Sequence, residues 1–188
     1  MPPAKTVKTA KNRQKRTVTF SPNLTPAQIF KLGSFGGAYW RDVYSSVLKK
    51  QLSNQHHKFP FLSDISESLL VNNNREYGNS KINRYKVRAS SSLKEWEKSG
   101  WITKHDPYGW VQWYCNYYNG RRIENEDKRQ IDRWMKTAGP RSRFRLMLIN
   151  ELKRRGKPFN DFKVYPRIRQ TLQHWGVRLT PAMLLHGG

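Results

Sequence analysis

The fold is decided by residues 106–120, which read Asp106-Pro107-Tyr108-Gly109-Trp110-Val111-Gln112-Trp113-Tyr114-Cys115-Asn116-Tyr117-Tyr118-Asn119-Gly120. The spacing of its aromatic residues places them along one face of a short helix. We expect Asp106 and Pro107 to start this helix, because Asp caps free N–H groups and Pro has the φ angle of the first helical position. Asn119-Gly120 is a helix-stop signal. This periodicity favours a buried core face over an exposed platform for stacking bases.

A dense set of basic residues follows this helix, namely Arg121, Arg122, Lys128, Arg129, Arg133, Arg141, Arg143 and Arg145. Most of them fall on two predicted helices, one over 124–136 and one over 140–155, which Gly139-Pro140 separates. Arginines in the first turns of the second helix oppose the helix dipole. Such a placement is expected where a helix N-terminus faces phosphate.

The overall charge of the chain also indicates a polyanionic partner. The chain has 188 residues, with 36 Lys and Arg against 13 Asp and Glu, which gives a net charge of +23. A charge of this size needs a partner of opposite sign, and nucleic acid is the commonest such partner. The aromatic content of 13% is well above that of a disordered basic tail, so most of the chain should fold.

Cysteine and hydropathy exclude several other classes of protein. Cys115 is the single cysteine, which excludes an internal disulfide and a cysteine-based zinc site, and we expect it to be buried. No apolar run has the length of a membrane span, and the N-terminus lacks the apolar core of a signal peptide. The sequence therefore predicts an intracellular protein with no membrane partner.

Residues 1–20 are predicted to be a basic, disordered tail. The segment Lys11–Arg16 has the composition of a nuclear import signal or of a phosphate-binding arm. A capping box, Thr25-Pro26-Ala27-Gln28, then predicts a helix that ends at Gly33. The cluster Gly33-Ser34-Phe35-Gly36-Gly37 follows a helix instead of a strand, so we expect a tight turn instead of a phosphate-binding loop.

The next part of the chain predicts several short elements. We expect a helix over 38–52, a short helix over 63–71 and a short strand over 84–88. Ser92-Leu93-Lys94-Glu95 is a second capping box, and its helix should end at Gly100. The adjacent pair His56-His57 is expected in an exposed loop, because neighbouring side chains point apart in regular structure.

A last helix is predicted over 166–175, with Ile168, Leu172 and Trp175 facing inward. Its other side would present Arg167, Arg169, Gln170, Gln173 and His174. Arg and Gln read base edges in the major groove, so this could be a recognition helix. An ordinary amphipathic surface helix explains the same pattern and is favoured. Residues 180–188 are expected to form a C-terminal tail.

Catalytic chemistry finds little support in the sequence. The acidic residues are few and occur mostly at a helix start, so no carboxylate cluster for Mg²⁺ is predicted. Asp106 beside His105 is the single candidate for a glycosylase, and its role as a helix cap is simpler. Tyr117 or Tyr118 beside Arg121 and Arg122 allows a strand-transfer enzyme without supporting one. The sequence therefore identifies no catalytic residue and leaves open whether the protein is an enzyme, and we predict no metal site and no cofactor.

Several of these motifs also resemble a known family. They are Gly33–Gly37, Gly109–Cys115, Gly120–Arg122, Arg129–Trp134 and Arg167–Trp175. Together they resemble an uncharacterised protein family found in eukaryotes and large DNA viruses, over about residues 21–179. The resemblance implies a single folded domain, and it implies no activity or catalytic residue.

The sequence thus predicts one compact, mainly α-helical domain over 21–179, with about six short helices and room for a small β element. The favoured function is nucleic-acid binding through the arginine-rich surface, with DNA ahead of RNA. One alternative is an enzyme acting on nucleic acid, such as a nuclease, glycosylase or recombinase. Another is a structural basic protein that condenses nucleic acid or binds acidic protein. A nuclear location, or a viral particle or factory for a virus-encoded protein, is compatible with each. The sequence makes no prediction of oligomeric state.

Overall fold

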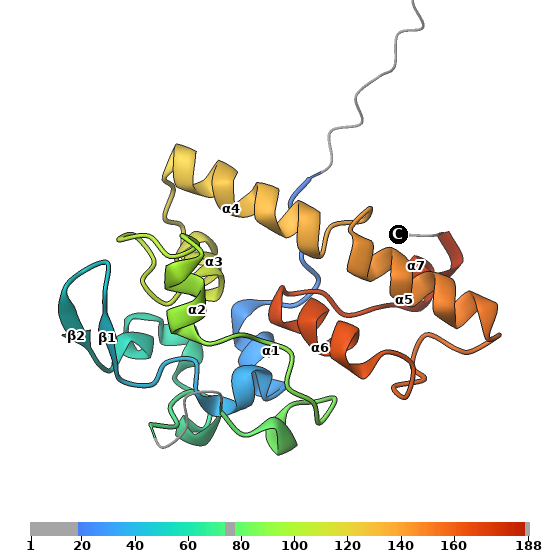
Figure 1. Cartoon of the computed structure of the whole chain (residues 1–188), viewed down its shortest axis with the longest axis horizontal. Helices are drawn as coiled ribbons and strands as arrows, with labels where there is room; N and C mark the ends of the chain where they lie inside the picture. The colour runs from blue at the N-terminus through green and yellow to red at the C-terminus, as the bar shows by residue number, and fades with distance from the viewer. Residues whose placement is uncertain (1–18, 74–77, 187–188) are drawn as a thin grey trace, which may run out of the picture.

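A computed structural model describes residues 19–73 and 78–186, so the basic segment Lys11–Arg16 lies outside the described residues. The described chain is mainly helical, as predicted, and has one small β-sheet (Figure 1). Its α-helices are α1 (Pro26–Lys31), α2 (Leu93–Lys98), α3 (Trp110–Tyr118), α4 (Glu124–Thr137), α5 (Arg143–Arg154), α6 (Pro166–His174) and α7 (Pro181–His186). Short 3₁₀ helices lie between them: η1 (Ser34–Gly37), η2 (Gln55–Lys58), η3 (Pro60–Leu62), η4 (Glu67–Leu69) and η5 (Ser80–Ile82). None of these helices combines the length and the apolar character needed to cross a membrane.

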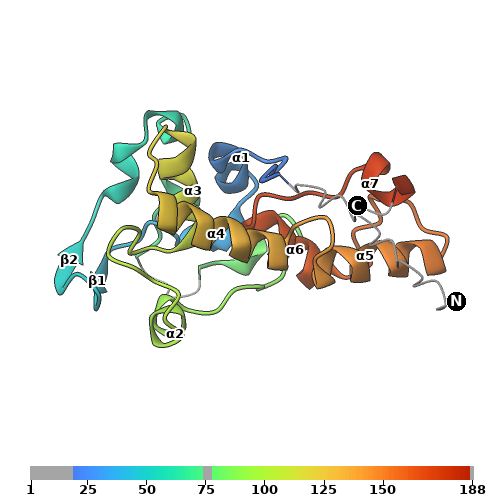
Figure 2. The same cartoon turned by 90° about the horizontal axis from the view of Figure 1, so that it is seen from above.

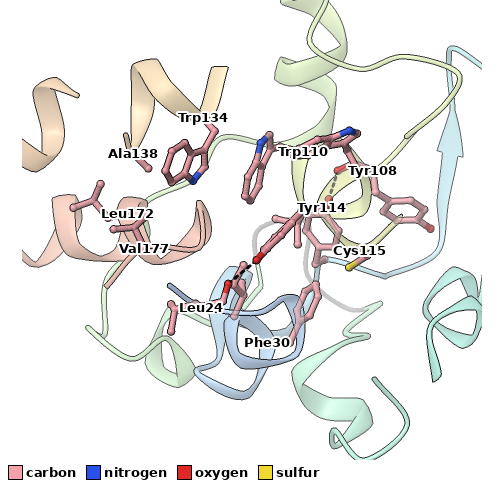
Figure 3. Close-up of a cluster of buried hydrophobic side chains, with 14 of the residues drawn as sticks. Leu24, Phe30, Tyr108, Trp110, Tyr114, Cys115, Trp134, Ala138, Leu172 and Val177 are labelled. Carbon is pink, nitrogen blue, oxygen red and sulfur yellow. Dashed lines mark hydrogen bonds between the residues drawn. The ribbon is translucent and has the colours of Figure 1, made fainter. Parts of the chain in front are cut away.

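Helix α3 lies at the centre of the hydrophobic core. Its Trp110, Trp113 and Tyr114 are buried, and α1 and α4 pack against it. Figure 3 shows Tyr114 reaching Leu24, whose carbonyl oxygen accepts the tyrosine hydroxyl at 3.0 Å. Cys115 is fully buried on the same helix. The predicted core face is therefore confirmed for Trp110, Trp113 and Tyr114, whereas Tyr118 at the end of the helix is exposed.

The predicted cap of this helix is wrong. Gly109, with φ of 89°, is the residue before α3, and no side chain caps the helix start. Asp106 is instead buried, and its carboxylate accepts Nη1 and Nη2 of Arg121 at 2.9 and 2.5 Å and Nδ2 of Asn116 at 2.9 Å. A buried carboxylate needs a cation or hydrogen-bond donors, and the chain just after α3 supplies both.

Helices α4, α5 and α6 pack together, with both α4 and α6 lying against α5 (Figure 2). Asp127 joins α4 to α3, because its carboxylate accepts the Trp113 indole N–H at 2.8 Å and the Ile123 backbone N–H at 2.9 Å. Helix α5 begins at Arg143, three residues later than predicted, because Ser142 caps it. The predicted C-terminal tail contains α7, which packs on α5.

The region between α1 and α2 differs most from the sequence prediction. The expected helix over 38–52 is an antiparallel hairpin of β1 (Val43–Ser45) and β2 (Lys50–Leu52). The backbone N–H of Trp40 bonds to the carbonyl of Leu70 at 2.9 Å, a pairing that is incompatible with a helix there. Of the helix expected over 63–71, only the single turn η4 forms.

The expected strand over 84–88 is also absent from the described residues. The Arg84 N–H bonds to the Leu32 carbonyl, and the Tyr85 N–H bonds to the side chain of Gln170. These two N–H groups therefore do not pair with a neighbouring strand. Alternation of basic and apolar residues along the chain does not by itself guarantee such pairing. His56 is likewise buried, at 4% exposed, where an exposed loop was expected.

The ordered domain begins before residue 21. The Phe20 ring makes edge contacts with Trp113, Tyr114, Tyr117 and Trp134 at centroid distances of 5.1–5.7 Å. Asn23 then bonds to the backbone N–H and carbonyl of Arg178, each at 2.8 Å, so the start of the domain is joined to the segment after α6. Phe20 is therefore a core residue and not part of a tail.

Candidate nucleic-acid interface

Two of the predicted binding arginines are held by acidic side chains. Arg121 forms the bidentate pair with Asp106 described above. Arg129 bonds to Glu126 through Nη2 at 2.7 Å and Nε at 3.0 Å, and its guanidinium also reaches the Trp101 carbonyl. Both guanidinium groups stabilise the fold in this arrangement. They do not form an open row of cations.

Two further arginines are buried, although the sequence pattern placed them outward. Arg169, at 3% exposed, donates to the carbonyls of Val164, Phe159 and Asp161 at 2.8–3.0 Å. Arg145 is 4% exposed, and its Nη2 lies 3.3 Å from the sulfur of Met183. Burial lowers the pKa of both guanidinium groups. The prediction that these two side chains face solvent is wrong, because the 158–165 connection and α7 cover them.

The predicted base-reading side of α6 is also buried. Gln173 donates to the Ser34 hydroxyl at 2.8 Å, and Gln170 accepts the Tyr85 N–H at 3.2 Å. His174 is 4% exposed. Helix α6 packs on α5 and on η1, so Gln173 and His174 bond to η1, whereas Gln170 bonds to the backbone of Tyr85. These three side chains cannot read base edges in a groove from this position.

The remaining predicted cations lie at the surface. Lys128, Arg141, Arg143 and Arg167 are exposed, and so is Lys136, which the prediction omitted. Arg122 is also exposed, but its guanidinium stacks on the Tyr117 ring at 3.7 Å and bonds to the Tyr117 carbonyl at 2.6 Å. Lys128 and Lys136 are separated by about 12 Å along α4. Only some of the predicted basic residues are therefore exposed and able to contact a partner.

An aromatic cleft of about 480 Å³ lies where α2, α4 and α6 converge. Its lining includes seven aromatic side chains, Phe35, Tyr39, Trp96, Trp101, Trp110, Phe144 and Trp175. Its polar lining includes Arg133, Lys136, Thr171 and His174, with no acidic side chain. Sequence reasoning missed this cleft because its walls come from segments spread between residues 35 and 175. The high tryptophan content was the only signal of it.

The glycine-rich turn forms one wall of the cleft, and it is the tight turn that was predicted. Phe35 lies in the left-handed region, with φ of 62°, between Gly33 and Gly36. A Cβ atom on Gly36 would collide with the backbone of Asn79, so this close approach requires glycine. The Gly36 N–H also bonds to the Asn83 side chain at 2.8 Å. This packing fixes Phe35 in a strained conformation beside the cleft.

His174 lies against this turn as a neutral imidazole of defined tautomer. Its Nε2 accepts the Phe35 backbone N–H at 3.2 Å and the Gln170 amide at 3.0 Å. Because Nε2 is an acceptor, the ring proton is on Nδ1, which bonds to no other described residue. Burial lowers the His174 pKa to about 3, and the ring stacks on Phe35 at 4.1 Å. His174 therefore lines the cleft as a neutral group.

Arg133 is the predicted binding residue that reaches the cleft from α4. Its guanidinium lies 5.5 Å from the Trp101 ring and 5.5 Å from the Trp175 ring. Nη1 donates to the Gln130 side chain at 3.0 Å. Burial, and then the nearby charge of Arg129, lowers the Arg133 pKa to about 10, so the group stays charged at neutral pH. The cleft therefore combines aromatic faces with the positive charges of Arg133 and Lys136.

A more open hollow of about 450 Å³ extends the cleft along α6. The two share Ala89, Ser90, Ser91, Phe144 and Thr171, and the hollow adds Arg88 and Arg167. Its acidic residue, Glu95, is held in the α2 capping box by the Ser92 N–H at 2.7 Å and the Ser92 hydroxyl at 2.9 Å. The hollow thus provides a basic extension to the aromatic cleft.

Comparisons with protein-family models, curated proteins and solved structures found no match to this chain. The resemblance to the family of eukaryotes and large DNA viruses therefore stays a prediction.

Proposed function

We propose that this protein binds nucleic acid, holding an unpaired base in the aromatic cleft and phosphates on the surrounding exposed cations. The observation that carries the proposal is a cleft of aromatic side chains and Arg133, without an acidic residue in its lining. DNA is the favoured nucleic acid, with RNA as the alternative. A nuclear location, to which the segment Lys11–Arg16 would contribute, belongs to the same proposal.

The cleft has the chemistry that an unstacked base requires. Trp101 is 45% exposed and Phe144 is 37% exposed, so both rings can offer a face to a planar guest. Stacking of a base on an aromatic side chain contributes about 1–3 kcal/mol and tolerates any base. The His174 Nδ1–H and the Arg133 guanidinium would donate to carbonyl or ring-nitrogen acceptors on the base edge.

The same lining disfavours another guest of aromatic pockets. Aromatic cages bind quaternary or methylated ammonium groups through the faces of their rings. Here Arg133 and Lys136 already place positive charge in the lining, and a cationic guest would be repelled. A neutral planar group attached to an anion fits both the rings and the charges.

The surface charge supports contacts with phosphate. Residues 1–20 contain six of the 36 basic residues and no acid, so residues 21–188 retain a net charge of +17. Even one-to-one pairing with every acid would leave this excess unneutralised. Lys136 in the cleft lining and Arg167 in its extension are exposed, and they would release counter-ions on binding phosphates.

The test measures binding of a labelled single-stranded DNA of about 12 nucleotides by fluorescence anisotropy, beside its duplex and its RNA equivalent. We expect single-stranded DNA to bind best, with affinity falling steeply between roughly 50 and 200 mM salt. Trp101→Ala should weaken this binding roughly 5- to 150-fold. Tyr118→Ala is the matched control, because Tyr118 is 52% exposed and lies outside the cleft.

Each alternative has its own outcome in this assay. Absence of salt-sensitive binding to any probe would overturn the proposal. If Trp101→Ala and Phe144→Ala left tight binding unchanged, the cleft would not be the binding site. That result would favour a structural protein that condenses nucleic acid. Cleavage or base release, seen on denaturing gels with and without Mg²⁺, would favour the enzyme.

A further inference from the structure

A second cluster of chemically active side chains lies away from the cleft, in the segment between β2 and α2. It consists of His56 and His57 on η2 and Glu67 on η4. One ring nitrogen from each histidine and one oxygen from Glu67 all lie within 4.8 Å of one another. The two imidazole rings have centroids 4.1 Å apart, so these neighbouring side chains converge instead of pointing apart.

His56 has an unusual environment for a histidine. It is 4% exposed, and neither ring nitrogen makes a hydrogen bond to a described residue. A buried polar group without a partner is uncommon in folded proteins, because losing its hydration is unfavourable. Its Nε2 lies 3.4 Å from Oε1 of Glu67, which is longer than the usual N–H···O separation of about 2.9 Å.

That 3.4 Å separation of Nε2 and Oε1 is the spacing expected for two ligands of one tetrahedral zinc ion. Zn²⁺ binds histidine nitrogen and carboxylate oxygen at about 2.0–2.2 Å, so two such ligands on a tetrahedron are about 3.4 Å apart. An ion at this point would satisfy Nε2, one of the two buried ring nitrogens of His56.

We propose that His56, His57 and Glu67 bind one Zn²⁺ ion, with water as the fourth ligand. Two imidazoles and a carboxylate suit zinc better than Mg²⁺ or Ca²⁺, which prefer oxygen ligands. The ion would tie η2 to η4 beside the buried Phe59 and Leu62. The proposed zinc site is independent of the proposed binding of nucleic acid.

The test uses the full chain without a polyhistidine tag, treated with a chelator and then titrated with ZnCl₂ by calorimetry. We expect one ion to bind per chain, and the melting temperature to rise with zinc concentration. Glu67→Gln should weaken the binding at least tenfold, and the exposed position of Glu67 makes misfolding of this variant a small risk. His56→Gln should abolish binding.

The exposed His186 provides a matched control for adventitious binding to surface histidines. His186→Gln should retain the one-to-one stoichiometry and the affinity of the unmodified chain. Absence of a one-to-one complex, or an affinity that Glu67→Gln leaves unchanged, would overturn the zinc site.

Discussion

Replacing Arg121 with methionine tests whether this arginine stabilises the fold or contacts nucleic acid. Arg121 is 26% exposed and Asp106 is fully buried, so the substitution leaves a carboxylate inside the protein without its cation. Breaking such a pair costs about 3–5 kcal/mol. Asn116 still donates to Asp106, so we expect the lower end, about 3 kcal/mol. For a chain of this size, that corresponds to a fall in melting temperature of roughly 6–12 °C.

The stability loss should depend on pH in a defined direction. Burial raises the Asp106 pKa even with Arg121 present, and removing Arg121 would raise it further. A carboxyl group with a raised pKa binds its proton more tightly in the folded state, so folding is favoured as pH falls. The deficit of Arg121→Met should therefore be smaller at pH 5 than at pH 7. Adding Asp106→Asn should recover much of the loss at pH 7.

Urea denaturation followed by tryptophan fluorescence would measure these free energies, and anisotropy at a temperature where the variant is folded would measure its DNA affinity. We expect the affinity to change less than threefold. A loss of stability below 1 kcal/mol, together with a tenfold loss of affinity, would show that Arg121 contacts the ligand and would refute this reasoning.

Three further predictions concern the core and its titrating groups. Phe20→Ala should lower the free energy of unfolding by about 2–3 kcal/mol, because it removes four aromatic contacts. An unchanged urea midpoint would show that Phe20 does not contribute to the core. The His174 pKa is depressed to about 3, so below the unfolded pKa of about 6.5 the unfolded chain takes up a proton that the folded chain does not. Lowering the pH from 7 to 5 should therefore reduce the free energy of unfolding by about 2 kcal/mol. Urea titrations at both pH values should show that His174→Asn lacks this pH-dependent loss. Burial raises the pKa of the Cys115 thiol, so a thiol reagent should label it only in denaturant, and rapid labelling of the native protein would contradict its burial.

The parts of the fold that were predicted correctly depend on local interactions. Thr25 with Gln28, and Ser92 with Glu95, form their capping boxes as expected, because each box involves residues three positions apart. The periodicity of the α3 aromatic residues correctly placed Trp110, Trp113 and Tyr114 in the core, although Tyr118 is exposed. The failures occur where a distant segment intervenes: the Leu70 carbonyl bonds to Trp40, and Gln170 bonds to the backbone of Tyr85.

The candidate site was predicted only in part, for a related reason. Arg133 and His174 do line the cleft, but its aromatic walls come from segments that are far apart in the sequence. The convergence of His56 and Glu67 was equally hidden, because it depends on how η2 and η4 pack. Spacing along a helix indicates which side chains share a face, but it does not show what covers that face.

The sequence by itself determined the net charge, the helical class of the fold and the aromatic helix at its core, because composition and local periodicity are properties of the chain. Only the tertiary structure decided the role of each arginine. Arg121 and Arg143 are chemically identical, yet one neutralises a buried carboxylate and the other is exposed to solvent. The physical reason is that the environment of a charged group depends on the segments packed around it, and packing in this molecule joins residues far apart in the chain.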